Sequence, residues 1–237
     1  MERPYRLSIA VPVYNEEKTI ETILRKLTAL PIKGFEIIVI DDASKDKSYG
    51  IITEYFQKHK GIPHTIVSHS KNMGKGAGIK TALKTAEGEY FVIQDADLEY
   101  DPKDLVGLLM FAEKNKVEAV YGSRFLGDFK NMPRANYYAN RFYNFLLRRL
   151  YDTSITDMHT CYKMIKTDLL NDINMTANGF SYASELVSKL LRRGITIHEL
   201  PISFSGRTKK EGKKIGYLDG IKCTQELLTY RFRTNRV

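Results

Sequence analysis

The sequence predicts an α/β fold built on one open, mostly parallel sheet with helices covering both faces. Three observations lead to this prediction: short runs rich in Ile and Val recur along the chain, segments with helical apolar spacing separate them, and polar turns follow them. Strands that alternate with helices in this way form parallel β-α-β units. Ligands of such sheets bind beyond the carboxyl ends of the strands.

The first half of the chain alternates regularly. The segment between the first two strands has Ile20, Ile23, Leu24 and Leu27 at helical spacing, which predicts a β-α-β unit with a right-handed crossover. The same pattern then repeats. Strands are expected at 7–13, 36–40, 65–68 and 90–93, and helices at 19–30, 49–59 and 76–86.

The second half is less regular but shows no internal repeat and no linker, so residues 1–237 are interpreted as one domain. Strands are expected at 119–121 and 196–200, and helices at 102–114, 134–150, 182–192 and 218–232. Two of these helices, 134–150 and 218–232, combine aromatic residues with arginines. An aromatic stripe is more often core, so packing on the sheet is favoured over an interfacial helix at a membrane.

Composition indicates a globular protein with a buried core, since 43% of the 237 residues are hydrophobic and 27% are charged. Cys161 and Cys223 are far apart, which suggests neither a disulfide framework nor a zinc site and favours a reducing cytosol. No run approaches the roughly 20 apolar residues that span a bilayer, and the N-terminus lacks the apolar core of a secretory signal. The chain is therefore not expected to cross a membrane by itself.

The net charge of +9 is concentrated at the C-terminus. Residues 206–237 contain nine Lys or Arg against three acids, which makes this segment a basic arm. Such an arm suits nucleic acid, an anionic bilayer surface or a phosphorylated substrate, because electrostatic attraction does not distinguish among them.

An acidic cluster, Asp95-Ala96-Asp97-Leu98-Glu99, follows the strand expected at 90–93. Alternate residues of an extended segment point the same way, so Asp95 and Asp97 can face one cavity. Carboxylate oxygens suit Mg²⁺ or Mn²⁺ that shares ligands with a diphosphate. The alternative is a solvated acidic turn in which Asp97 caps the following helix.

Polar residues also follow the first two strands. Asp41 and Asp42 end the second strand, where carboxylates commonly hold a base or a ribose, and Pro12 to Glu16 end the first. Helix capping by Ser44 or Asp46, or by Asn15 or Glu16, is the alternative. Three strand ends are thus expected to bring polar groups to one edge of the sheet.

A glycine-rich segment, Asn72-Met73-Gly74-Lys75-Gly76-Ala77-Gly78, matches neither common phosphate-binding motif. Ile79 stands where both the Walker loop and the dinucleotide fingerprint need glycine. A nucleotide hydrolase or a dehydrogenase is therefore disfavoured. Backbone amides at the start of the next helix still suit a phosphate or a base.

These motifs, followed by Gly122-Ser123-Arg124, occur in the order seen in family-two glycosyltransferases with the GT-A fold. The set is specific, although no single member is. The chain most resembles the polyprenyl-phosphate sugar synthases, of the dolichol-phosphate mannose synthase type, from about Leu7 to Phe232.

The resemblance implies an inverting, metal-assisted transfer from a nucleotide-sugar to a polyprenyl or dolichyl phosphate. GDP-mannose is the favoured donor, and UDP-glucose or a UDP-N-acetylhexosamine is possible. Residues 1–101 would form the nucleotide-sugar-binding half and 102–237 the acceptor-binding half. The predicted donor site comprises Pro12, Tyr14, Glu16, Asp41, Asp42, Asn72, Lys75, Asp95, Ala96 and Asp97; the metal ligands are Asp95, Asp97 and Glu99; Arg124, Arg134, Arg207 and Lys213 bind phosphates; and Asp97 and Arg124 are the catalytic residues.

The chain departs from the pattern at two places. Glu99 replaces a frequent glutamine, which keeps an oxygen ligand, and the segment 156–163 stands where the synthases carry a short Asp-containing Thr/Gly motif, which leaves the sugar open. Within that segment His159 is interpreted as structural or acceptor-side in preference to a base. Glu185 falls where the family often has a glutamate near the active site, and an exposed helix glutamate is the alternative.

Three functions remain open at this stage. A polyprenyl phosphate is already anionic, so its attack needs positioning and charge stabilisation but no base; a glycan hydroxyl acceptor would need one. A basic module that binds nucleic acid or a membrane surface would leave the acidic strand ends unexplained. The favoured synthase implies a membrane surface and a membrane-anchoring partner, because the chain stops at Val237, and no nucleic acid. Its expected location is the cytoplasmic face of a membrane.

Overall fold

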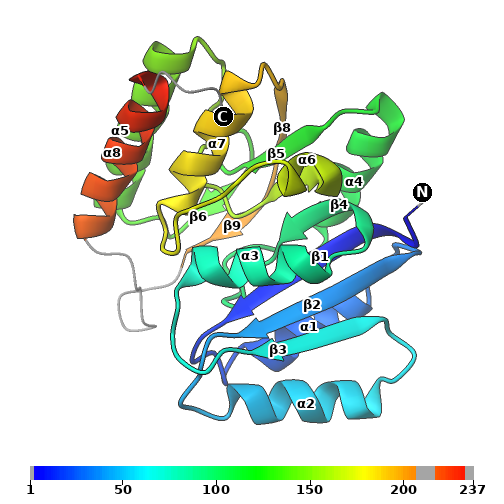
Figure 1. Ribbon diagram of the computed structural model, residues 1–237. Coiled ribbons are helices and arrows are strands. Elements are labelled where there is room, and N and C mark those ends of the chain that lie inside the picture. The colour runs from blue at the N-terminus through cyan, green and yellow to red at the C-terminus, as the bar shows by residue number, and fades with distance from the viewer. Residues whose placement is uncertain (1–2, 207–216, 233–237) are drawn as a thin grey trace.

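A seven-stranded sheet forms the centre of the computed structural model, which describes residues 3–206 and 217–232 (Figure 1). The strand order is β3-β2-β1-β4-β7-β5-β8, and β7 is antiparallel to both of its neighbours. Figure 1 shows α3 and α6 in front of the sheet and α1 behind it. The predicted mostly parallel sheet with helices on both faces is confirmed.

The first four strands form a continuous parallel block of the sheet, and β5 and β8 form a second parallel pair. The register of the first four strands places Val13 beside Asp41 and Ala10 beside Ile93, so their carboxyl ends share one edge. Ile9, Val39 and Val92 are completely buried, as expected for parallel strands that are covered on both faces. The elements are β1 (Tyr5–Val13), α1 (Ile20–Thr28), β2 (Phe35–Asp41), α2 (Ser48–Lys58), β3 (His64–Ser68), α3 (Lys75–Thr85) and β4 (Gly88–Ile93).

The second half extends this sheet and adds a layer of helices beside it. The elements are α4 (Asp104–Asn115), β5 (Ala119–Ser123), β6 (Phe129–Lys130), α5 (Arg134–Tyr151), β7 (Lys163–Lys166), α6 (Thr167–Asn171), α7 (Tyr182–Arg192), β8 (Ile197–Pro201), β9 (Phe204–Ser205) and α8 (Tyr217–Phe232). Strands β6 and β9 pair separately from the main sheet. The predicted helices 134–150, 182–192 and 218–232 are confirmed within one or two residues.

Strand β7 was not predicted, although it lies in the middle of the sheet between β4 and β5. Its sequence, Lys-Met-Ile-Lys, is short and has a lysine at each end, so it lacks the apolar run that marks the other strands. Lys163 is nevertheless buried, because its ammonium group donates to the carbonyl oxygen of Thr160. Local hydrogen bonding therefore permits a buried strand that hydropathy does not show.

Helices α5 and α8 stand together at one end of the molecule (Figure 1). The hydroxyl of Tyr151 donates to the carbonyl of Leu227 at 2.8 Å, and α5 buries Leu147. The aromatic stripe of α5 faces outward instead: Tyr138, Phe142 and Phe145 are 68%, 57% and 56% exposed. The favoured interpretation of this stripe as core was wrong, since α5 packs through its opposite face. No helix in the described parts of the chain is long and apolar enough to span a membrane.

Candidate active site

The carboxyl edge of the parallel strands opens into a cavity of about 1050 Å³. Strand register brings the ends of β1, β2 and β4 together there, and the amide of Gln94 donates to the carbonyl of Ala10 at 2.8 Å, which holds the turn after β4 against β1. Most of the predicted site residues line this cavity: Pro12, Tyr14, Glu16, Asp42, Asn72, Lys75, Asp95, Ala96, Asp97, Glu99 and Arg124.

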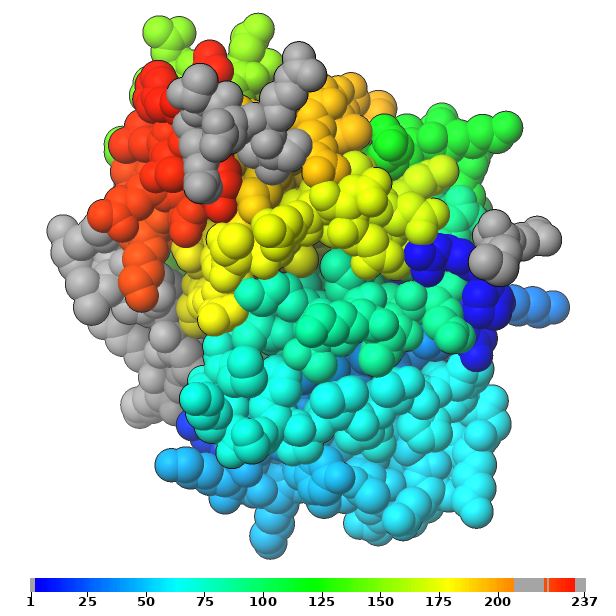
Figure 2. All heavy atoms as spheres, in the orientation of Figure 1, coloured from blue at the N-terminus to red at the C-terminus, as the bar shows by residue number. Residues whose placement is uncertain are grey.

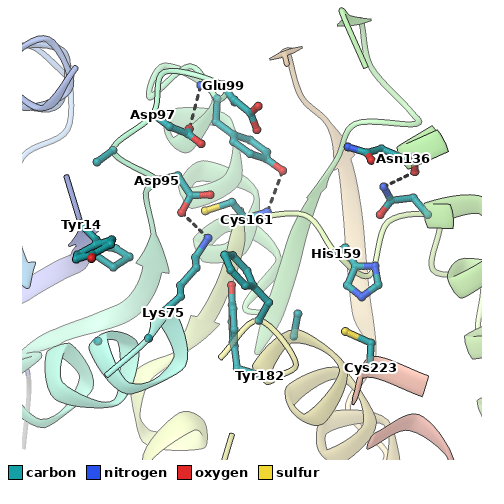
Figure 3. Close-up of a pocket in the computed structure, with 18 of the residues that line it drawn as sticks. Tyr14, Lys75, Asp95, Asp97, Glu99, Asn136, His159, Cys161, Tyr182 and Cys223 are labelled. Carbon is teal, nitrogen blue, oxygen red and sulfur yellow. Dashed lines mark hydrogen bonds and ion pairs between the residues drawn. The ribbon is translucent and has the colours of Figure 1, made fainter. Parts of the chain in front are cut away.

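Lys75 and Asp95 form an ion pair at the centre of the cavity wall (Figure 3). Burial alone would lower the pKa of Lys75, but the charge and hydrogen bond of Asp95, together with Cys161 and Tyr182, offset this and raise the pKa well above its usual value. The ammonium group therefore stays charged, beside the place where the acidic cluster and the glycine-rich turn meet. A cation in this position suits the negative charge of a diphosphate.

Asp97 and Glu99 lie next to Asp95 on the same loop and also line the cavity (Figure 3). The amide of Glu99 donates to Asp97 Oδ1 at 3.1 Å. Helix α4 has no side-chain cap, which excludes the alternative that Asp97 serves as one. These carboxylates thus line the cavity and do not cap helix α4.

The donor set of this loop fits a hard divalent cation such as Mg²⁺ or Mn²⁺ in its chemistry, because all three predicted ligands are carboxylates. In the described part of the chain, however, no group of three or more His, Cys, Asp or Glu is gathered closely enough to hold a metal ion. Asp95 is engaged with Lys75. The described residues therefore supply suitable carboxylates but do not by themselves gather the three predicted ligands into a metal site.

The two aspartates after β2 have different roles. Asp42 lines the cavity and accepts hydrogen bonds from the amides of Met73 and Gly74, both at 2.8 Å, so it fixes the glycine-rich turn. Asp41 lies beneath the cavity surface at 2% exposure, and its Oδ1 has no hydrogen-bond partner among the described residues. A buried acceptor without a partner is costly unless a ligand group satisfies it.

Capping, the alternative for this loop, applies to only one of its residues. Asp46 Oδ1 accepts from the amide of Ser48 at 3.0 Å, in the first turn of α2. Asp46 Oδ2 accepts from the amide of Glu17 at 3.1 Å, which ties the loops after β1 and β2 to each other. Capping therefore explains the position of Asp46 but does not explain Asp41 or Asp42.

Arg124 lines the cavity and is held in a buried ion pair. Its Nε and Nη2 donate to the two carboxylate oxygens of Asp157 at 2.7 and 2.8 Å, and its backbone amide donates to the same carboxylate at 3.0 Å. Burial opposes the charge of Arg124, but Asp157 raises the pKa of the guanidinium above its usual value. Asp157, in the segment that departs from the family pattern, therefore fixes the predicted phosphate-binding arginine.

The unpredicted β7 region supports the acidic loop from behind. Tyr162 donates through its hydroxyl to the side-chain oxygen of Gln94 at 2.6 Å, and the thiol of Cys161 donates to the carbonyl of Ile93 at 3.4 Å. Both contacts join residues 68 positions apart, and no local pattern connects them. Both cysteines are free and buried.

The other half of the cavity is lined by the inner faces of α5, α7 and α8, and its lining is mainly apolar. Sequence reasoning missed most of it, because small and aromatic residues on helices carry no motif. The hydrogen-bonding groups here include Asn136 and His159, which face the cavity from the side opposite Tyr14 (Figure 3). The lining residues are Met132, Ala135, Asn136, Ala139, Asn140, Tyr143, His159, Cys161, Phe180, Tyr182, Ala183, Phe204, Gly220, Cys223 and Thr224.

His159 lines the cavity but is a poor base. Burial lowers the pKa of its imidazole to about 3, an effect that Lys163 strengthens and Asp157 opposes. Its Nε2 is buried without a hydrogen-bond partner among the described residues. Near neutral pH the ring is uncharged and has little affinity for a proton, which argues against a role as a base and leaves the structural and the acceptor-side roles open.

Stability should fall as pH drops from about 6.5 toward 3, in part because of His159. The folded pKa of about 3 lies below the ordinary 6.5, so the unfolded chain binds more protons in this interval and acid favours unfolding. We expect the urea concentration at the midpoint of unfolding to differ less between pH 7 and pH 4.5 in His159→Gln than in the wild-type chain. His64→Gln, at an exposed histidine, is the control. An unchanged difference in His159→Gln would contradict the assignment.

The alternative that Glu185 is an exposed helix glutamate was wrong, because this residue is buried; it does not itself line the cavity, although Tyr182 and Ala183 on the same helix do. It is completely buried on α7, where Lys189 donates to its carboxylate at 2.6 Å. Arg134 is exposed at the first turn of α5 and does not line the cavity. Arg207 and Lys213 lie outside the described residues.

Comparison with known proteins agrees with this geometry. A dolichol-phosphate mannosyltransferase from Pyrococcus furiosus is 25% identical over 89% of this chain and 60% of its own length. A dolichyl-phosphate beta-glucosyltransferase from Dictyostelium discoideum is 24% identical over 96% of this chain and 74% of its own length. A mannosyltransferase from Pyrobaculum calidifontis, solved with GDP-Man and Mn²⁺, superposes with a TM-score of 0.65 at 24% identity over 97% of this chain and 63% of its own.

An open sheet with an acidic cavity at its carboxyl edge has the GT-A architecture of nucleotide-sugar transferases, which confirms the predicted fold. The model of glycosyl transferase family 2 matches residues 8–173. The chain belongs to this family and is a sugar transferase. It spans less than two thirds of the Pyrococcus and Pyrobaculum proteins.

Proposed function

We propose that this protein transfers a sugar from a nucleotide-sugar to a polyprenyl or dolichyl phosphate. The observation that carries the proposal is the composition of the cavity. Its donor half has the acidic loop and Lys75, its other half is mainly apolar, and the buried Arg124 lines the cavity. A phosphate attached to an apolar chain matches this arrangement, because its phosphate suits Arg124 and its hydrocarbon chain suits the mainly apolar half.

The donor proposal rests on the edge formed by β1, β2 and β4. Tyr14, Asp42, Lys75 and Asp95 surround the place where a nucleoside diphosphate would lie. Just beneath them, the Oδ1 of Asp41, which has no hydrogen-bond partner among the described residues, suits a hydrogen-bond donor of a base or ribose. GDP-mannose is the favoured donor, because one relative and one solved neighbour are mannosyltransferases and that neighbour holds GDP-Man. The glucosyltransferase relative keeps a glucose donor as the second candidate.

The acceptor proposal rests on chemistry that needs no base. His159 has too low a pKa to remove a proton near neutral pH, and Glu185 is enclosed by its partners. A lipid phosphate is already an anionic nucleophile, whereas a glycan hydroxyl would need activation. Arg124, held by Asp157, would orient the phosphate, and Arg207 and Lys213 are proposed as further phosphate contacts.

The reaction would be a single in-line displacement at the anomeric carbon. One acceptor phosphate oxygen forms the new bond while the bond to the nucleoside diphosphate breaks, so an α-linked donor gives a β-linked product. A divalent metal held by Asp97, with Asp95 and Glu99, would neutralise the leaving diphosphate. Lys75 adds a second positive charge there, and apolar side chains of the acceptor half exclude water.

The decisive experiment is transfer from radiolabelled GDP- and UDP-sugars to a short polyprenyl phosphate in Mg²⁺ or Mn²⁺, beside a matched glycan acceptor without phosphate. We expect one donor to label the lipid and none to label the glycan. Labelling of the glycan alone would replace the proposal with the hydroxyl-transfer alternative. Anomeric configuration by NMR tests inversion, and retention would contradict the single displacement.

A lipid acceptor also requires access to a membrane, for which the outer face of α5 is suited. Its exposed aromatic residues Tyr138, Phe142 and Phe145 lie among Arg141 and Arg149, the combination typical of interfacial helices. We therefore place the protein on the cytoplasmic face of a membrane, with an anchoring partner protein as a further proposal.

Substituting Phe142 and Phe145 together by serine should weaken binding to anionic vesicles, because the favourable free energy of inserting each ring into the bilayer interface is lost. We expect about ten-fold weaker binding per ring, measured by vesicle sedimentation. Met110→Ser, at a residue of α4 that is 63% exposed, is the control and should have no effect. Equal partitioning of the double variant and the control would exclude this face as the contact.

A further inference from the structure

A buried carboxylate joins α8, α7 and the segment 174–178. Glu185 is completely buried and accepts five hydrogen bonds: from Thr176 N at 2.7 Å and Oγ1 at 2.9 Å, from Ala177 N at 2.7 Å, from Lys189 Nζ at 2.6 Å and from the hydroxyl of Tyr230 at 3.0 Å. With these donors around it, the carboxylate is enclosed and cannot act on a substrate. What it does is hold the segment 174–178 in one position.

This segment in turn supports the glycine-rich turn at the start of α3. The carbonyl of Asn178 accepts from the amide of Ala77 at 3.1 Å. A Cβ on Gly76 would lie 2.5 Å from the carbonyl oxygen of Ala177, and one on Gly74 would lie 2.7 Å from that of Asn178. Figure 2 shows the atoms of this part of the chain, in yellow, directly against those of α3. The segment therefore cannot shift toward the turn without moving it.

The turn carries Lys75, whose ammonium group is paired with Asp95 in the cavity. A continuous chain of contacts thus runs from Tyr230 on α8 through Glu185 and the segment 174–178 to the donor side of the site. Helix α8 is also the neighbour of α5, to which Tyr151 binds it. The position of α8 and the position of Lys75 are linked by these contacts.

We propose that Glu185 is a positioning residue for the donor-binding turn 74–77, and that the Tyr230 hydroxyl from α8 helps to hold Glu185 in place. The inference rests on the proposed function only in taking a nucleoside diphosphate as the ligand of this turn; it does not depend on the acceptor. Neither residue touches the donor. Both act by fixing the backbone that presents Lys75.

Nucleotide affinity tests this proposal in two variants and one matched control. Tyr230→Phe removes the hydroxyl that reaches Glu185 but keeps the ring, which lies 4.8 Å from Lys189 Nζ. Glu185→Gln places an amide where the carboxylate accepts its hydrogen bonds. Tyr151→Phe removes a hydroxyl that also holds α8 but does not contact Glu185.

Titration calorimetry with GDP and with UDP, in Mn²⁺, gives the Kd of each variant, and thermal unfolding gives its Tm. We expect the Kd to rise about five-fold in Tyr230→Phe, as for the loss of one hydrogen bond, and more in Glu185→Gln, while Tyr151→Phe lowers Tm at unchanged Kd. In turnover the two variants should raise the KM for the donor more than they lower kcat.

A lower Tm with unchanged Kd in Tyr230→Phe would overturn the proposal and leave a purely structural role. If Glu185→Gln does not fold, Tyr230→Phe alone decides, because it alters one hydroxyl. Failure of the wild-type chain to bind either nucleotide would remove the ligand on which the inference rests. A failed lipid acceptor together with the expected Kd pattern would refute the proposed acceptor and leave this inference intact.

Discussion

Replacing Asp97 by alanine is expected to lower kcat/KM for sugar transfer by about 10² to 10³-fold, because the carboxylate proposed to hold a divalent cation against the leaving diphosphate is removed. Asp97 lines the cavity beside Asp95, and its carboxylate accepts the amide of Glu99 at 3.1 Å. The measurement is initial rate against donor concentration at fixed Mn²⁺, with labelled lipid or labelled product as the readout.

Two further substitutions make the result specific. Asp97→Asn keeps an oxygen that can accept the Glu99 amide but removes the charge, so it should be nearly as inactive as the alanine variant. Asp101→Ala removes a carboxylate two residues further along the loop from Glu99, outside the cavity lining, and should retain activity. Full activity of Asp97→Asn would show that Asp97 serves the shape of the loop and not the charge of the site.

Replacing Arg124 by methionine is expected to destabilise the fold by about 3–5 kcal/mol, because it leaves the completely buried Asp157 carboxylate without its partner. The same variant should lose transfer activity, since the cation proposed to bind the acceptor phosphate is gone. Urea unfolding followed by circular dichroism measures the first effect, and transfer under folding conditions measures the second.

The double variant Arg124→Met/Asp157→Asn separates stability from activity. Both charges are then absent. The backbone amide of residue 124, which donates to Asp157 in the wild-type chain, can still donate to the asparagine oxygen. We expect most of the lost stability to return while transfer remains absent. Lys58→Met, which breaks an exposed ion pair on α2, should leave both quantities unchanged. Recovery of activity in the double variant would exclude Arg124 from the reaction.

The sequence by itself predicted the first four parallel strands and the polar residues that meet at their carboxyl edge. Strands such as β1 and β2 are short apolar runs, and helix α1 buries Ile20, Ile23, Leu24 and Leu27 at the spacing that predicted it. Residues at the ends of parallel strands must meet at one edge, which is why Tyr14, Asp42 and Asp95 could be assigned to one site before their positions were known.

Only the tertiary structure decided the remaining features. Strand β7, the enclosure of Glu185 and the pairing of Arg124 with Asp157 depend on contacts between residues that are distant in sequence or hidden from hydropathy. The aromatic stripe of α5 is exposed because the helix packs on the rest of the protein through its other face. The spacing of apolar residues along a helix does not show whether protein or another surface covers them. Local periodicity and the ends of strands can be recognised from neighbouring residues. The helical half of the cavity, in contrast, forms only when α5, α7 and α8 pack together.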